Sequence, residues 1–162
     1  MRDEADNFYE HHFLNSSPYD LIYFTSFTGG DMLDLFDECL EALGEQKEIL
    51  SEELTATYYE MLSNSFPFTF WGRIKWEEVS CHQSIDYEEE IDEWLHVNHF
   101  KDRNIIILWG YGDQPALRTS LDNALNAIDD VAAVGSDTFL FSESGYVIEI
   151  FHDGDVTIGK AD

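Results

Sequence analysis

Apolar residues recur at helical spacing in the first third of the chain. The spacing predicts a helix over Asp31–Leu43, with Asp31 as its N-cap and Gly44 just beyond its end, and a second helix over Ser51–Leu62. A further helix is predicted over residues 8–14, whereas the pattern over Leu21–Phe27 fits either a strand or a helix. The apolar stripes are Met32, Leu33, Phe36, Cys39, Leu40 and Leu43 in the first of these helices, and Leu54, Tyr58, Met61 and Leu62 in the second.

From Phe66 the apolar period changes to two, which predicts a strand over Phe66–Trp76. Its alternate positions place Phe66, Phe68, Phe70, Ile74 and Trp76 on one face, and Thr69, Trp71, Arg73 and Lys75 on the other. We expect the aromatic residues Trp71, Trp76 and Trp109 to lie in the core of a sheet rather than at a binding site.

The C-terminal part of the chain mixes helices and strands. The predicted elements are a helix around Tyr87–His96, a strand over Asn104–Trp109 covered on both faces, a helix that starts at Pro115 and buries Leu117, Leu121, Ala124, Leu125 and Ile128, and strands over Thr138–Phe141, Tyr146–Phe151 and Val156–Ile158. Asp153-Gly154 predicts the last hairpin turn. These elements together predict a single domain over residues 1–162, helix-rich over 1–65 and sheet-rich over 66–162. We predict an α+β fold, with an antiparallel or mixed sheet that ends in a β-meander and packs against several helices.

The chain carries 34 acidic and 8 basic side chains, a formal net charge of −26. Apolar residues make up 44% and aromatic residues 15%, which excludes a disordered acidic tail because such tails lack aromatic residues. Charge of this sign repels nucleic acid and anionic lipid, and it attracts positively charged partners. We therefore expect a protein that binds a basic protein partner and does not bind nucleic acid or membranes directly.

The first residues lack the basic and apolar regions of a signal peptide, and no apolar run reaches the ~20 residues of a membrane-spanning helix. Cys39 and Cys81 are far apart and have no partners at metal-ligand spacing, so we expect two reduced thiols. These features together predict a cytoplasmic protein.

Histidine and cysteine residues offer candidate metal ligands at three places. The candidates are Glu93, His96 and His99, which could share a helical face, together with Cys81-His82 and His152-Asp153. A structural zinc site usually has paired Cys or His residues at tight spacing, and a catalytic one keeps three ligands beside an open position. Nothing further along the chain completes a metal site with the His-x-x-His pattern of His96 and His99. The sequence therefore favours histidines at the surface, and we expect no metal or cofactor.

Two patterns could indicate catalysis or phosphate binding. Gly110-x-Gly112 lies between a predicted strand and a predicted helix, but it lacks the third glycine of the dinucleotide fingerprint and the lysine of a P-loop, which favours a tight turn. Carboxylate pairs such as Asp129-Asp130 and Asp153/Asp155 could serve acid–base catalysis, although pairs arise by chance among 34 carboxylates. No nucleophile motif accompanies them, so we predict that the protein is not an enzyme.

Acidic residues have unfavourable neighbours in two predicted helices. Five of them stack at spacings of three and four on the first helix, which costs about 0.2–0.5 kcal/mol per pair in isolated helices. Asp129-Asp130 is predicted at the C-terminal end of the Pro115 helix, where the macrodipole disfavours negative charge by roughly 0.3–1 kcal/mol per group. A third concentration, over Asp86–Glu93, suits a helix start. We therefore predict that a basic partner binds Asp34, Asp37, Glu38, Glu41, Glu45, Asp129 and Asp130.

Three segments in the C-terminal hundred residues resemble the small immunity proteins of bacterial contact-dependent growth inhibition and related polymorphic toxin systems. They are the sequences FPFTFWGRIKW over Phe66–Trp76, WGYGDQPAL over Trp109–Leu117 and AVGSDTFLF over Ala133–Phe141. The resemblance implies a cytoplasmic antidote that binds a cognate toxin domain, often a tRNase or DNase, and blocks it. It implies no interface residues, because immunity proteins vary most where they contact their toxins.

These observations favour an immunity protein whose acidic side chains cover the substrate-binding surface of a basic toxin, with a few exposed aromatic residues as the buried anchor. Binding beside the active site would inhibit by steric exclusion equally well. Two alternatives stay open: an acidic mimic of nucleic acid that inhibits DNA-binding enzymes, and a metal-dependent hydrolase if the histidines converge.

Overall fold

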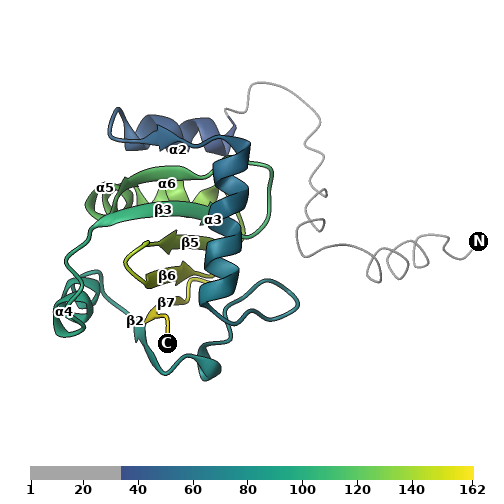
Figure 1. Cartoon of the computed structure of the whole chain (residues 1–162). Helices are drawn as coiled ribbons and strands as arrows, with labels where there is room; N and C mark the ends of the chain where they lie inside the picture. Colours follow the sequence, from purple (N-terminus) through teal and green to yellow (C-terminus); the bar gives the residue numbers. More distant parts are fainter. Residues whose placement is uncertain (1–33) are drawn as a thin grey trace, which may run out of the picture.

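The computed structural model describes residues 34–162, so the elements predicted over residues 8–14 and 21–27 lie outside the described residues. Figure 1 shows a twisted sheet crossed by one long helix, α3. In chain order the elements are α2 (Leu35–Leu43), β1 (Glu48–Ile49), α3 (Glu52–Ser65), the 3₁₀ turn η1 (Trp76–Glu78), β2 (Cys81–Ile85), α4 (Glu89–Val97), β3 (Asn104–Trp109), β4 (Leu117–Ser120), α5 (Leu121–Asn126), α6 (Ile128–Ala133), β5 (Thr138–Phe141), β6 (Tyr146–Ile150) and β7 (Val156–Lys160).

The strands form one antiparallel sheet of seven strands in the order β1-β4-β3-β5-β6-β7-β2. Its C-terminal part, β5-β6-β7, is a meander in which Phe141 pairs with Val147, and Ile148 pairs with Ile158. Gly154 turns the last hairpin at φ +96°, a backbone conformation that glycine adopts without steric cost. The predicted α+β fold with a C-terminal meander is confirmed.

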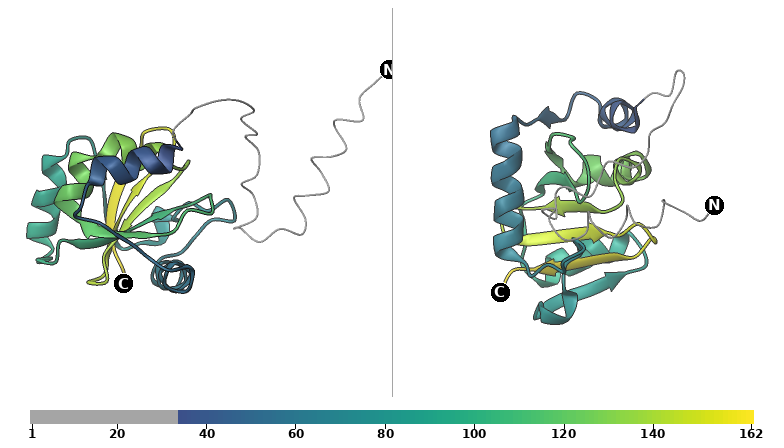
Figure 2. Two further views of the ribbon diagram at one scale, coloured as in Figure 1. Left: turned by 90° about the horizontal axis from the view of Figure 1, so that it is seen from above. Right: turned by 90° about the vertical axis from the view of Figure 1, so that its right-hand side faces the viewer.

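Helices cover both faces of the sheet. Seen from above in Figure 2, α3 lies on one face, and α2, α4, α5 and α6 lie on the other. The central strand β3 contributes side chains to both hydrophobic cores. Ile105 and Ile107 pack in the core under α2 and α4–α6, whereas Ile106 packs in the core under α3. This arrangement explains the unbroken apolar run of β3, as predicted for a strand covered on both faces.

The helix α2 begins later than predicted. Asp34 has a ψ of 131°, and its Oδ1 accepts a hydrogen bond from the N–H of Phe36 at 3.2 Å, so Asp34 rather than Asp31 is the N-cap of the helix. Cys39 and Leu43 are buried, as the apolar stripe predicts. Cys39 and Cys81 are both free thiols.

The helix α3 confirms its prediction and extends to Ser65. The Oγ of Ser51 accepts a hydrogen bond from the N–H of Leu54 at 3.2 Å and caps the helix. Tyr58 and Leu62 are buried against the sheet, but Leu54 is 41% exposed, so the buried stripe is shorter than predicted.

Residues 66–76 form a tight hairpin rather than the predicted continuous strand. The N–H of Thr69 donates to the carbonyl of Arg73 at 2.7 Å, and the N–H of Lys75 donates to the carbonyl of Pro67 at 2.8 Å. The chain reverses at Gly72, whose φ of +90° disfavours any residue with a Cβ. Because both arms of a hairpin keep a period of two, the sequence pattern could not reveal the reversal.

The helix predicted from Pro115 is a strand followed by two short helices. β4 pairs with β3, Ser120 caps α5 by accepting a hydrogen bond from the N–H of Asn123, and Ala127 separates α5 from α6. Leu117, Leu121 and Ala124 enter the same core from β4 and α5. Their spacing therefore imitated the stripe of one continuous helix.

The two strands at the edges of the sheet, β1 and β2, were not predicted from the sequence. In β2, Ile85 is buried and the next three residues toward its start are exposed, so the strand shows no apolar alternation. The helix α4 lies close to its predicted range. Within residues 34–162, no helix is both long enough and apolar enough to cross a membrane.

Candidate protein-interaction surface

The helices α2 and α6 pack against each other on one face of the sheet and bring the predicted acidic residues together. Asp37 and Glu41 are exposed on α2, and Asp129 is exposed on α6. Burial, and secondly the charge of Asp130, raise the pKa of Cys39 in α2 to about 11, which places Asp130 beside α2. We call the following residues the α2–α6 acidic surface: Asp34, Asp37, Glu38, Glu41, Glu45, Asp129 and Asp130.

The acidic residues are better accommodated by their helices than the sequence indicated. Asp37 and Glu38 lie in the first turn of α2, where the macrodipole favours negative charge. Asp129 and Asp130 lie in the first turn of α6 and not at a helix C-terminus, because β4 and the break at Ala127 divide the predicted Pro115 helix. The prediction that the macrodipole disfavours this pair is therefore wrong.

In the described part of the chain, the charge of this surface is not neutralised by neighbouring cations. Within residues 34–162, none of the seven residues takes part in an ion pair. By contrast, Arg103 binds Asp92 of α4 at 2.8 Å and Asp122 of α5 at 2.6 Å. Hydrogen bonding to Arg103 lowers the pKa of Asp122. Arg103 therefore neutralises Asp92 and Asp122, whereas Glu88, Glu89 and Glu93 at α4 have no ion pair within residues 34–162, like the seven residues of the α2–α6 acidic surface.

A buried carboxylate holds the hairpin 66–76 on the sheet. Glu149 of β6 is 1% exposed, and its carboxylate accepts hydrogen bonds from the N–H of Ile74 at 2.9 Å and from Nε1 of Trp76 at 2.6 Å. The Nε of Arg73 lies 3.5 Å from the same carboxylate. Burial raises the pKa of Glu149 against the opposing effect of these donors. The sequence signal for this role is one charged residue inside the apolar run of β6, which the predictions from the sequence overlooked.

The hairpin carries two exposed aromatic side chains at its tip. Phe70 is 82% exposed and Trp71 is 50% exposed, with ring centroids 4.7 Å apart. Trp76 and Trp109 are buried, as predicted, but the prediction that Trp71 lies in the core is wrong. The N–H of Gly72 donates to the carbonyl of Thr69, so Trp71 lies at the turn of the hairpin and outside both cores.

The candidate metal ligands do not converge. The Sγ of Cys81 donates to Oδ1 of Asn98 at 3.2 Å, the Nδ1 of His82 lies 2.8 Å from the carbonyl of Val79, and the Nδ1 of His152 lies 3.4 Å from Oδ1 of Asp137. In the part of the chain that the structure describes, no group of three or more His, Cys, Asp or Glu residues could hold a metal ion.

The segment around Gly110-x-Gly112 is a turn, as predicted, and it leads into β4 rather than into a helix. The N–H of Gly110 donates to the carbonyl of Asp137 at 2.7 Å. A phosphate site of the kind considered from the sequence needs a helix N-terminus directly after the glycines. The strand at this position removes that possibility.

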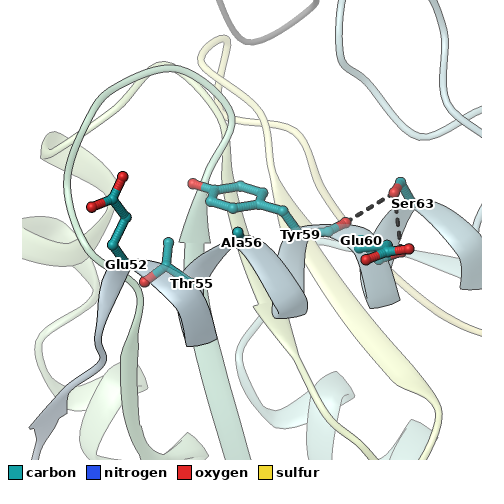
Figure 3. A pocket seen from close by; sticks show the side chains of 6 residues that line it. All are labelled: Glu52, Thr55, Ala56, Tyr59, Glu60 and Ser63. Carbon is teal, nitrogen blue, oxygen red and sulfur yellow. Dashed lines mark hydrogen bonds between the residues drawn. The ribbon is translucent and has the colours of Figure 1, made fainter.

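An open hollow of about 370 Å³ lies along one side of α3 (Figure 3). The described residues that line it are Glu52, Thr55, Ala56, Tyr59, Glu60 and Ser63. The hydroxyl of Tyr59 donates to the carbonyl of Trp109 at 2.6 Å, which ties α3 to β3. These lining residues include no histidine, cysteine or basic side chain.

Comparison with known proteins adds two findings. Residues 33–159 match the family described as "CdiI immunity protein EcoliA0-like". The "Uncharacterized protein YqzI" of Bacillus subtilis (strain 168) is 86% identical to the chain over 35 residues, which make up 22% of this chain and 67% of that protein. The name of this relative states no activity, so the functional argument rests on the first match.

Proposed function

The chain belongs to the EcoliA0-like CdiI immunity protein family, and from this premise we propose that it binds a cognate CdiA toxin domain of basic charge in the cytoplasm and covers its substrate-binding surface. The toxin in this proposal is a nuclease that acts on tRNA or DNA. CdiI immunity proteins are non-enzymatic inhibitors, which confirms the prediction that the chain is not an enzyme.

The observation that carries the proposal is the α2–α6 acidic surface. A nuclease must hold the phosphates of its substrate with Lys and Arg side chains, so its substrate-binding surface is basic. Exposed carboxylates on two adjacent helices, without ion-pair partners among residues 34–162, offer the complementary charge. Such complementarity accelerates encounter and restricts partner choice more than it raises affinity.

Inhibition follows from competition for the same surface. A carboxylate that lies against the basic groove of the toxin occupies the position of a substrate phosphate, and the bulk of the folded inhibitor excludes the polynucleotide. No chemical step is required of the inhibitor. Affinity then depends on apolar contacts in addition to charge, because exposed ion pairs contribute little.

The proposal is tested by co-expression with the toxin domain encoded by the adjacent upstream reading frame. We expect a 1:1 complex by size-exclusion chromatography with light scattering, and loss of nuclease activity on tRNA or plasmid DNA. An unrelated basic nuclease serves as the control. Absence of a complex would overturn the proposal, and equal binding to the unrelated nuclease would instead indicate a general mimic of nucleic acid.

A further inference from the structure

The tip of the hairpin 66–76 is the most apolar exposed feature in the described part of this acidic protein. Phe70 is 82% exposed and lies next to Trp71, which is 50% exposed. Tight turns are dominated by Gly, Pro, Asn, Asp and Ser residues. Two adjacent aromatic side chains at such a position therefore need an explanation.

The fold does not need these two side chains. At the base of the hairpin, Phe66 and Ile74 are each 2% exposed, and Phe68 packs edge-on against Phe139 of β5 with ring centroids 5.6 Å apart. These residues supply the apolar contacts between the hairpin and the sheet. Phe70 and Trp71 instead contact each other in a T-shaped arrangement with an interplanar angle of 87°, and neither belongs to either core.

The tip is nevertheless held firmly in place. The Oγ1 of Thr69 accepts a hydrogen bond from the N–H of Arg73 at 3.0 Å, and the N–H of Gly72 donates to the carbonyl of Thr69 at 3.1 Å. From the neighbouring loop, the hydroxyl of Tyr111 donates to the carbonyl of Trp71. Below the tip, Glu149 binds the hairpin backbone at Ile74. A pre-organised aromatic pair loses little conformational entropy on binding, which favours affinity.

Carboxylates outnumber cations along the arm of the hairpin that follows the tip. Arg73 is paired with Glu149 and Asp155, and Lys75 is paired with Glu78, so carboxylates already neutralise both cations of the hairpin. Exposed Asp153 accepts a hydrogen bond from the N–H of Asp155 at 3.1 Å, and exposed Glu77 follows the base of the hairpin. An apolar tip on a hairpin flanked by these carboxylates, in a chain of net charge −26, is complementary to an apolar recess bordered by Lys or Arg side chains.

We propose that Phe70 and Trp71 are the aromatic anchor that inserts into an apolar recess, bordered by basic side chains, on the cognate toxin domain. This inference rests on the function proposed above and assigns the affinity of the complex to the hairpin. The base of the hairpin packs in the core under α3, on the face of the sheet opposite α2 and α6 (Figure 2). The α2–α6 acidic surface then guides the approach of the toxin domain by long-range attraction, while the hairpin makes the contact that holds it. Buried aromatic residues are typical binding hot spots, whereas charges at the rim mainly set the association rate.

The test compares two double variants with the wild-type protein in binding to the toxin domain by surface plasmon resonance. Phe70→Ala with Trp71→Ala removes the anchor. Tyr87→Ala with Val97→Ala is the matched control, because these side chains are 71% and 65% exposed at the two ends of α4, which lies on the opposite side in Figure 1. We expect the first pair to raise the dissociation rate about 100-fold or more with little change in association rate. We expect the control to bind like the wild type.

The outcomes separate this inference from the proposed function. If the wild type binds the toxin and the Phe70/Trp71 variant dissociates at the wild-type rate, the anchor is wrong and the proposed function stands. If the wild type does not bind, both are wrong. Self-association of the wild type that the Phe70/Trp71 variant abolishes, with toxin binding unchanged, would assign the tip to a homodimer and overturn the proposal. Hydroxyl-radical footprinting of the wild-type complex provides a test that needs no variant, and it should show protection of residues 70 and 71.

Discussion

At the scale of single residues, Glu149 decides where the hairpin lies. It satisfies a backbone N–H of Ile74 and the indole N–H of Trp76, two donors that the fold removes from water. A charged group that is 1% exposed is costly unless it is hydrogen-bonded and paired, and Arg73 supplies the pair. Glu149 is thus a structural carboxylate that fixes the position of the aromatic tip.

We predict that Glu149→Ala lowers the free energy of unfolding by about 3 kcal/mol or more, because it leaves two buried donors and the nearby Arg73 without their acceptor. Urea denaturation measures the change. Glu143→Ala, at an exposed position of the preceding turn, is the control and should alter stability by less than about 0.5 kcal/mol. Equal stabilities of the two variants would contradict this role of Glu149.

At the scale of elements, the sequence predicts helices and strands along which one apolar period repeats, and it misses the places where the chain reverses direction. The stripes of α2 and α3, the doubly buried β3 and the C-terminal meander could all be recognised, because each keeps one period over its whole length. The hairpin at Gly72 and the strand β4 could not, since apolar residues from two elements enter one core and imitate a single element. The edge strand β2 has too few buried residues to show any period.

The residues of the candidate protein-interaction surface could likewise be predicted only where they follow a pattern within one element. The acidic residues of α2 were found from their spacing on one helix, and the packing of α2 against α6 joins them to Asp129 and Asp130. Glu149 and the exposure of Phe70 and Trp71 depend on contacts between segments about 75 residues apart or on a chain reversal. No local pattern encodes such contacts.

Also at this scale, we predict that the position of the acidic charge matters more than its amount. Reversing Asp37, Glu41 and Glu45 to Lys should slow association with the toxin about 10-fold at low salt, because steering depends on local complementarity. Reversing Glu88, Glu89 and Glu93 beside α4 changes the net charge equally and is the matched control. Stopped-flow kinetics measure the association rates of both variants. Equal slowing by the two sets of substitutions would contradict a specific role of the α2–α6 acidic surface in steering the toxin.

At the scale of the whole molecule, a net charge of −26 opposes folding by self-repulsion. Two buried carboxylates add to this cost, since burial raises the pKa values of Asp137 and Glu149. A group whose pKa is raised by folding binds its proton more tightly in the folded state. Its contribution to stability is therefore greatest at low pH and is lost as the pH rises through the folded-state pKa.

We predict that the urea midpoint rises as the pH falls from neutral toward the ordinary carboxyl range, and that it also rises with added salt, which screens the repulsion. Below that range the trend reverses, because the pKa of Asp122 is lowered by its hydrogen bonds to Arg103 and this stabilisation is lost on protonation. Asp137→Asn should weaken the rise of the urea midpoint as the pH falls from neutral toward the carboxyl range. A midpoint that falls steadily from pH 7 to pH 5 would contradict the sign of this effect.

The central claim is that this chain neutralises one cognate basic toxin by binding it. The most direct measurement titrates a fixed concentration of the toxin domain with this protein and follows cleavage of tRNA and DNA, with an unrelated basic nuclease as the control. We predict a linear loss of activity that reaches zero at one equivalent, with no effect on the unrelated nuclease. Full activity of the toxin at a tenfold excess of this protein would contradict the claim.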